Sequence, residues 1–228
     1  MVLYWTVWII VRVGARLLFR LQVSGQDHIP RTGGVLIAAN HSSYLDIPIL
    51  GCALPRQASF IGRMDLFSGI VGTILRYLGW IPIRRERVDR KAFDEAVGRL
   101  KAGRVVVIYP EGTRSPDGRL QPGKPGIGMI AAAAGCPVVP ALLEGTYDAL
   151  PPGASWIRVR PIRVIFGQPM DFSAELEIES EDTKKVVYQQ MSQEVMDRIA
   201  ELRREMSSHV TPCPETERNR KRHQQLTL

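Results

Sequence analysis

Three observations predict an α/β fold for this chain, as a single domain with a largely parallel central sheet flanked by helices. Short apolar runs alternate with segments of helical periodicity along most of the sequence, which is typical of strands joined by crossover helices. With 228 residues, of which 45% are hydrophobic, the chain can bury a sizeable core as one domain. Charged residues make up 23%, close to the average for globular domains, so most of the chain is expected to fold.

Residues 1–24 predict an N-terminal amphipathic helix associated with a membrane. No charge occurs before Arg12, and Arg12, Arg16 and Arg20 then recur at four-residue spacing on one helix face. The uncharged run has eleven residues, whereas a spanning helix needs about 20, and the basic start of a secretory signal is missing. We expect the helix to lie in the membrane interface, with the arginines toward the headgroups and Trp5 and Trp8 toward the acyl chains. The alternative is an amphipathic helix packed on its own domain.

The main domain, expected over residues 25–206, begins with a turn-rich connection at 25–34. The following elements are read from apolar runs, helical periodicity and Gly or Pro boundaries. They are a strand at 34–39, a helix at 45–54 with Pro48 in its first turn, a strand at 58–62, a helix at 66–78, a strand at 80–85, a helix from a cap at Asp89 to a stop at Gly103, a strand at 104–109, a helix at 126–134, strands at 138–143 and 162–167, and a long helix at 184–205. The polar tail, 207–228, is expected to be disordered.

The net charge of +7 favours an anionic partner: nucleic acid, an acidic membrane surface or a phosphorylated substrate. The basic residues are scattered and no nucleic-acid-binding motif accompanies them, which argues against nucleic acid. No glycine-rich fingerprint follows a strand in the order that a nucleotide site needs. Cys52, Cys136 and Cys213 lie far apart without metal-binding spacing. Free thiols in a reducing compartment are therefore expected, with Cys52 and Cys136 packed in the fold.

The first of two polar segments that follow predicted strands is "AANHSSYLD", residues 38–46. His41 could accept a proton near neutral pH, and Asp46 could bond the other ring nitrogen and so fix the tautomer. A helix-capping histidine and a surface aspartate would be the ordinary alternative. Ser42 and Ser43 raise the possibility of a nucleophilic serine, but no G-x-S-x-G turn surrounds them.

The second polar segment is "YPEGTRS", residues 109–115, which follows the strongest strand signal in the chain. Glu111 and Arg114 leave this strand in a loop where backbone amides and a guanidinium could hold an anion, and the planar fork of arginine suits phosphate. A salt bridge in a surface turn is the alternative. Because ligands of open α/β sheets bind beyond the carboxyl ends of strands, the two segments are expected to form one active site.

Four motifs in order make the chain resemble the glycerolipid acyltransferase family, specifically the 1-acylglycerol-3-phosphate acyltransferases. "HSSYLD" resembles the first motif, a His and an Asp separated by four residues, with Asn40 in front of it. "GWIPIRR" resembles the second and ends at Arg85. "YPEGTRS" resembles the third, with Tyr109 where phenylalanine is usual, and "VVPALL" resembles the fourth, centred on Pro140. Lys124 resembles the lysine that follows the third motif.

The resemblance implies roles for individual residues. His41 would be the general base, and Asp46 would orient its imidazole and stabilise the positive charge that it acquires. The residues implied in binding the substrate phosphate are Arg85, Glu111, Gly112, Thr113 and Arg114. The supporting residues are Asn40, Ser42, Lys124 and Pro140. No metal and no other cofactor is implied.

The reaction implied by the resemblance moves a fatty acyl group from an acyl thioester, either acyl-CoA or acyl-ACP, to the sn-2 hydroxyl of 1-acyl-sn-glycerol-3-phosphate. The product would be phosphatidate for phospholipid biosynthesis. The partners would be lysophosphatidate in a membrane and the acyl donor, and the location would be the cytoplasmic face of the cell membrane. The alternative is an acyltransferase of the same fold that acts on glycerol-3-phosphate, another lysolipid or an amino-lipid. A lipid hydrolase and a non-catalytic lipid-binding protein are less favoured.

Overall fold

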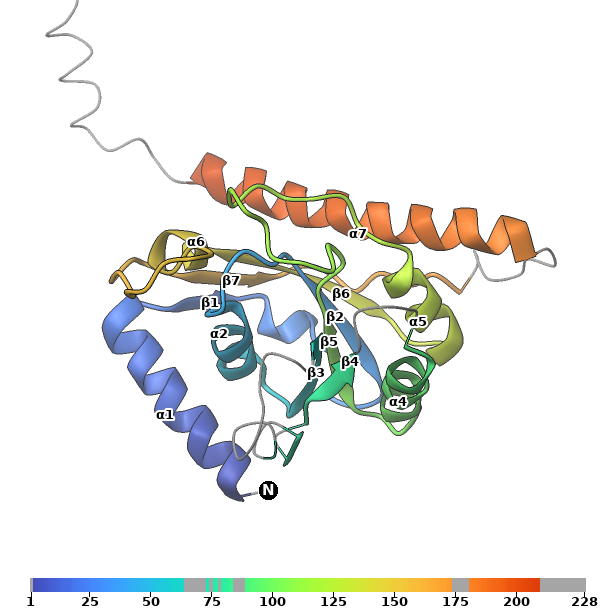
Figure 1. Ribbon diagram of the computed structural model, residues 1–228, viewed down its shortest axis with the longest axis horizontal. Coiled ribbons are helices and arrows are strands. Elements are labelled where there is room, and N and C mark those ends of the chain that lie inside the picture. The colour runs from blue at the N-terminus through green and yellow to red at the C-terminus, as the bar shows by residue number, and fades with distance from the viewer. Residues whose placement is uncertain are drawn as a thin grey trace, which may run out of the picture.

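The computed structural model describes residues 2–63, 73, 76–77, 79–83, 89–173 and 181–209 (Figure 1). Its sheet contains seven strands among these residues: β1 (Gln22–Ser24), β2 (Val35–Ala39), β3 (Ala58–Arg63), β4 (Ile81–Ile83), β5 (Val105–Ile108), β6 (Val138–Glu144) and β7 (Arg163–Phe166). Their order is β1-β7-β6-β2-β5-β3-β4. Every neighbouring pair is parallel except β6 with β7, so the predicted α/β fold with a largely parallel sheet is confirmed.

Helices cover both faces of the sheet (Figure 1). The elements on one face are α1 (Val2–Phe19) and α2 (Asp46–Ala53), and those on the other are α4 (Arg90–Lys101), α5 (Gly126–Ala134) and α7 (Glu181–His209). Strand β2 is buried throughout, and its successive residues alternate between the two cores. Val35 and Ile37 pack toward α1 and α2, whereas Leu36 and Ala38 pack toward the opposite helices. Burial on both faces explains why the strand reads as an uninterrupted apolar run.

Local capping explains the helix limits that the sequence predicts correctly. The Asp89 carboxylate accepts the N–H of Ala92 at 3.3 Å and starts α4. Gly103, just beyond the end of α4, has a φ of 75°. Helix α5 ends at Gly135 in the left-handed conformation, with a φ of 59°, which costs glycine little. The short helices η1 (Gln26–His28) and α6 (Thr146–Ala149) were not predicted.

Three predicted segments extend beyond the described residues. Most of the expected helix at 66–78 lies outside them, as do residues 84 and 85 of the strand expected at 80–85. Helix α7 runs from Glu181 to His209, so residues 207–209 are helical, contrary to the expected disorder. Residues 210–228 of the tail lie outside the described part of the chain.

The N-terminal segment is packed differently from the prediction. Trp8 donates its Nε1–H to the carbonyl of Leu54 at 3.2 Å, and the Arg12 guanidinium donates to the carbonyl of Cys52 at 2.6 Å. The Arg12 guanidinium also lies 4.8 Å from the centre of the Trp8 ring. These carbonyl groups lie at the end of α2, where a helix leaves acceptors without intrahelical partners. The expected placement of Trp8 and Arg12 against lipid is therefore wrong: both face the protein.

The opposite face of α1 carries large exposed apolar side chains: Ile9, Ile10, Val13, Leu17 and Leu18. Strand β1 pairs with β7, so residues 22–24 belong to the sheet and not to the N-terminal helical segment. None of the helices in the described ranges combines the length and apolar character needed to cross a bilayer.

Candidate active site

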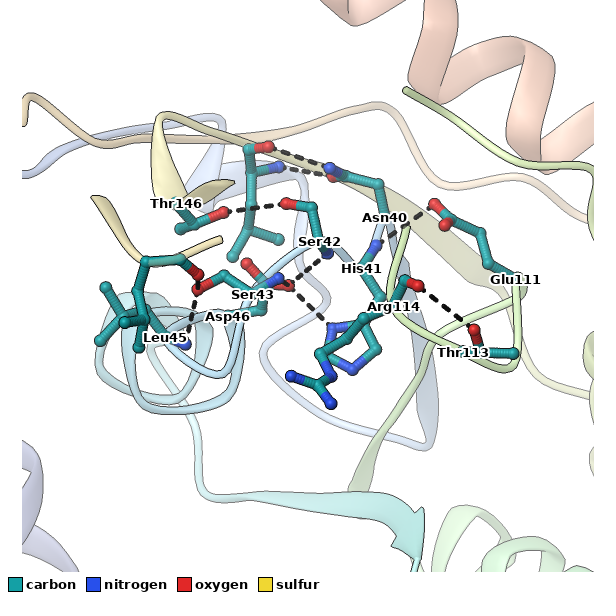
Figure 2. A network of polar contacts seen from close by, with 12 residues as sticks. Asn40, His41, Ser42, Ser43, Leu45, Asp46, Glu111, Thr113, Arg114 and Thr146 are labelled. Atoms are coloured by element: carbon teal, nitrogen blue, oxygen red, sulfur yellow. Dashed lines mark hydrogen bonds and ion pairs between the residues drawn. The ribbon is translucent and has the colours of Figure 1, made fainter. Parts of the chain in front are cut away.

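His41 and Asp46 form a hydrogen-bonded pair at the carboxyl end of β2 (Figure 2). The imidazole Nδ1 lies 2.8 Å from Asp46 Oδ2. The same carboxylate oxygen accepts the backbone N–H groups of Ser42 and Ser43, both at 2.7 Å. Asp46 is fully buried at the start of α2, whereas the His41 side chain is partly exposed. The turn between β2 and α2 is thus wrapped around one carboxylate.

This arrangement determines which nitrogen of His41 can take up a proton. An ionised carboxylate only accepts hydrogen bonds, so Nδ1 must carry the hydrogen that it shares with Asp46. In the neutral ring Nε2 then holds a lone pair. A general base with a buried carboxylate behind it is the pattern found in acyl-transfer sites.

The side chains between His41 and Asp46 fix the loop to α6 and the residues after it. The Ser43 hydroxyl donates to the carbonyl of Leu150 at 2.7 Å. The Ser42 hydroxyl lies 3.3 Å from that of Thr146. Both serines are buried and their hydroxyls are engaged in this scaffold, which fits the absence of a nucleophile motif around them.

Asn40 and Pro140 connect this part of β2 to β6. Asn40 Oδ1 accepts the N–H of Leu143 at 2.8 Å, and its Nδ2 donates to the Leu143 carbonyl at 3.0 Å. Pro140 pairs with Ala38, and its carbonyl accepts the N–H of Gly167 at 2.8 Å. Pro140 has no N–H to return this bond, and it stands where the pairing with β7 ends, one residue before Gly167.

Glu111 joins the second polar segment to the first. Its Oε1 accepts the backbone N–H of His41 at 3.2 Å, and the N–H of Ser115 donates to the His41 carbonyl at 2.7 Å. The Glu111 side chain is only 4% exposed. The pKa of this carboxyl is raised to about 8, chiefly by burial; the His41 N–H and the charge of Arg203 oppose the rise, and the charge of Asp46 adds to it. Its second oxygen has no hydrogen-bond partner among the described residues.

Arg114 and Lys124 supply positive charge beside this loop. The Arg114 guanidinium donates to the Tyr44 hydroxyl at 2.9 Å and lies 3.5 Å from the centre of the Tyr44 ring. Gly112 and Thr113 are exposed. Gly112 has a φ of 69°, and a Cβ there would come within 2.9 Å of Lys124 Nζ. Exposed backbone and two cations therefore occur together in the segment that follows β5.

Two aromatic contacts could not be foreseen from the motifs. The Tyr109 ring stacks on the His41 imidazole, with ring centres 4.1 Å apart and planes 19° apart. Burial raises the pKa of the Tyr109 hydroxyl well above its usual range. Tyr44, within the first motif, holds Arg114 of the third. The sequence marks Tyr109 only as a departure from phenylalanine, and Arg85 lies outside the described residues.

The chain's other candidate ligands and thiols are not arranged as a metal centre. Within the described ranges, no group of three or more His, Cys, Asp or Glu side chains could hold a metal ion. Cys52 is buried and Cys136 half-buried, both are free thiols, and burial raises the pKa of each to about 11. The expectation that these two cysteines are packed is confirmed.

A family model described as Acyltransferase matches residues 20–144, more than half of the chain. The chain belongs to the acyltransferase family. This match spans the first and third motifs, including His41, Asp46, Glu111 and Arg114, and it confirms the family resemblance seen in the sequence.

Several relatives of this chain share the name 1-acyl-sn-glycerol-3-phosphate acyltransferase. The chain is 33% identical over 157 residues to a chloroplastic 1-acyl-sn-glycerol-3-phosphate acyltransferase (BAT2) of Brassica napus, which aligns 67% of this chain and 45% of that protein. It is 28% identical over 152 residues to the 1-acyl-sn-glycerol-3-phosphate acyltransferase of Bacillus subtilis, aligning 66% of this chain and 73% of the relative. The chain thus spans less than half the length of the plant relative.

A solved structure has the same architecture. The crystal structure of the 1-acyl-sn-glycerophosphate (LPA) acyltransferase PlsC from Thermotoga maritima superposes with a TM-score of 0.68 and 28% sequence identity. The superposition covers 86% of this chain and 79% of that one.

Proposed function

We propose that this acyltransferase moves an acyl group from an acyl thioester to the sn-2 hydroxyl of 1-acyl-sn-glycerol-3-phosphate and so forms phosphatidate. The observation that carries the proposal is the 2.8 Å contact between His41 Nδ1 and Asp46 Oδ2, which leaves Nε2 as a base. The names of the relatives support the choice of acceptor.

In the proposed reaction, Nε2 of His41 removes the proton of the acceptor hydroxyl while the oxygen attacks the thioester carbonyl. Asp46 stabilises the imidazolium that results, and two backbone N–H groups hold its carboxylate in position. The tetrahedral intermediate then expels the thiolate, which takes the proton back from His41. A general base of this kind contributes on the order of a hundred to ten-thousand-fold in rate.

The phosphate of the acceptor is proposed to bind at Arg114, with Lys124 and the exposed backbone of Gly112 and Thr113 beside it. The guanidinium offers two parallel donors, and the Tyr44 ring limits its rotamers. Arg85 keeps its proposed role as a further phosphate ligand. Glu111 is proposed to act by positioning, because its carboxyl is buried against the His41 backbone.

The donor is proposed to be acyl-CoA or acyl-ACP, with no metal or other cofactor taking part. The acceptor carries one long chain and resides in a bilayer, so the protein is proposed to lie on the cytoplasmic face of the membrane. The exposed apolar face of α1, which includes Ile9, Ile10, Val13 and Leu17, is suited to this attachment. The proposed organisation is therefore an N-terminal membrane-contacting helix, an acyltransferase domain and a polar C-terminal tail.

An acyl-transfer assay with purified protein in detergent tests this function. Lysophosphatidate and glycerol-3-phosphate are offered separately, each with acyl-CoA and with acyl-ACP. We expect phosphatidate from lysophosphatidate alone, and a loss of at least about a hundredfold in His41→Ala. His28→Ala is the matched control, because the only bonds of this second imidazole within the described ranges go to the carbonyl of Phe166 and the side chain of Gln168.

The two variants must first show the circular dichroism of the parent protein. Full activity of a folded His41→Ala variant would remove the general base from the mechanism. Thioester consumption that is independent of any acceptor would instead identify a hydrolase.

A further inference from the structure

The loop between α6 and β7 exposes an unusual set of side chains, which we call the WIRVR loop: Trp156, Ile157, Arg158, Val159 and Arg160. Trp156 is 84% exposed, Val159 69% and Ile157 56%, and both arginines are exposed. Single exposed apolar residues are common on proteins. Three large apolar side chains within four consecutive positions, interleaved with cations, are instead typical of an interaction surface.

One end of the WIRVR loop is bonded to the end of α1. The N–H of Ile162 donates to the carbonyl of Phe19 at 2.9 Å, and the N–H of Gln22 donates to the carbonyl of Ile162 at 3.0 Å. Figure 1 shows the segment between α6 and β7 beside this end of α1. Leu17, in the last turn of α1, is 78% exposed, and Leu18 is exposed as well. The loop therefore extends the apolar face of α1.

The middle of the loop is bonded close to the catalytic turn. The N–H of Arg158 donates to the carbonyl of Ala149 at 2.8 Å. The next carbonyl, that of Leu150, accepts the hydroxyl of Ser43, which lies between His41 and Asp46. A membrane or protein that binds the loop would thus lie close to the proposed base, because only Ala149, Leu150 and Ser43 separate the loop from the catalytic turn.

We propose that the WIRVR loop is a second membrane contact, which binds anionic phospholipid surfaces next to α1. This inference rests on the proposed function only in taking the membrane as the source of the acceptor. Indole rings and branched side chains partition into the interface of a bilayer, while arginines beside them attract anionic headgroups. Each arginine is worth on the order of fivefold in partitioning.

Two observations favour a membrane over a protein partner. The loop is continuous with the exposed leucines of α1, so the combined surface runs along one side of the molecule. The charge of the chain is +7, and the loop adds two cations without an acidic residue between 154 and 163. An acidic protein such as an acyl carrier would also match the charge, and the experiment must therefore separate the two.

Sedimentation of the full chain with vesicles tests the proposal, using phosphatidylcholine alone and an equal mixture of phosphatidylcholine and phosphatidylglycerol. Val159→Ser is expected to weaken binding to both vesicles. Its matched control is Val186→Ser, because Val186 is exposed on α7, away from the loop. The double variant Arg158→Gln/Arg160→Gln is expected to lose about twentyfold of the preference for the anionic vesicles.

Arg31→Gln is the charge control, because Arg31 is exposed before β2, at the opposite edge of the sheet from the catalytic loops. Fluorescence gives a second readout: a blue shift on binding that is absent in Trp156→Phe would place this indole in the lipid interface. Loop variants that bind both vesicles like the parent protein would overturn the proposal. So would variants that keep vesicle binding but lose binding to acyl carrier protein, which would identify a protein surface.

Activity in detergent micelles separates this inference from the proposed function. The loop variants are expected to keep phosphatidate formation there, because no vesicle surface is needed. If the parent protein showed no acyl transfer but its vesicle binding still depended on the loop, the proposed function would be refuted and the membrane contact would stand.

Discussion

Replacing Glu111 by glutamine should make the protein more stable at neutral and alkaline pH. The carboxyl lies buried between the two loops of the site, with one oxygen on the His41 N–H and the other unpartnered among the described residues. Glutamine has nearly the same shape, and its carbonyl oxygen can still accept the His41 N–H. The variant therefore removes the ability to ionise while keeping the contact.

The magnitude follows from the pKa of Glu111, which burial raises from 4.5 to about 8. Between these values the unfolded chain has released the proton and the folded chain still holds it. The unfolded state binds fewer protons, so stability falls as the pH rises. Each pKa unit corresponds to about 1.4 kcal/mol, so the loss approaches about 5 kcal/mol at pH 8. This is an upper limit, because relaxation of the loops can bring water to the carboxylate.

Urea denaturation of both proteins at a series of pH values measures the effect. The unfolding free energy of Glu111→Gln minus that of the parent should be near its minimum at pH 4.5 and should rise by several kcal/mol toward pH 8. Glu194→Gln, an exposed position on α7, should change stability by less than about 0.5 kcal/mol throughout. A difference for Glu111→Gln that stays constant across this range would refute the argument, because the carboxyl would then ionise as it does in water.

Three further substitutions test other contacts of the site. Asn40→Ala should lower the free energy of unfolding by about 3 kcal/mol, measured in urea, because both backbone groups of Leu143 lose a buried partner. Tyr109→Phe should raise the free energy of unfolding by about 1 kcal/mol and keep kcat. The substitution removes a hydroxyl with no partner among the described residues but leaves the stack on His41. A large fall in kcat would mean that the hydroxyl acts in catalysis. Arg114→Lys should raise KM for lysophosphatidate roughly tenfold, with kcat little changed, because the charge remains but one charge-assisted hydrogen bond is lost. An unchanged KM would mean that the phosphate does not bind at Arg114.

The fold could be predicted from the sequence wherever one local signal decided the structure. The strand at 105–108 is an apolar run between Gly and a loop, and α4 begins at a capping carboxylate and ends before a glycine. Strand β1 was missed because three residues carry too little periodicity, and its pairing with β7 depends on residues about 140 positions away. Short helices such as α6 were missed for the same reason, because a few residues carry too little periodicity to predict a helix.

The site could be predicted as a set of residues but not as a set of contacts. Parallel neighbours β2 and β5 bring the two motif loops to one edge, and this follows from the alternation of strands and helices. The inward direction of Glu111 does not follow, because a glutamate in a Pro/Gly loop is ordinarily solvated. Only the register of β2 against β5 places the His41 N–H where that carboxyl can bond it.

The orientation of α1 shows why hydrophobicity alone did not identify its protein-facing side. Tryptophan and arginine at a helix surface predict contact with a bilayer when only one helix is considered. In the folded chain, however, α2 ends with carbonyl groups that need donors, and the indole of Trp8 and the guanidinium of Arg12 supply them. These two donors turn the helix so that aliphatic side chains, Ile9, Val13 and Leu17 among them, face outward. The exposed face of α1 is therefore determined by the hydrogen-bonding needs of a neighbouring helix end. The same principle applies at the WIRVR loop, which is held by backbone hydrogen bonds at Arg158 and at Ile162, just beyond it, while its side chains remain exposed.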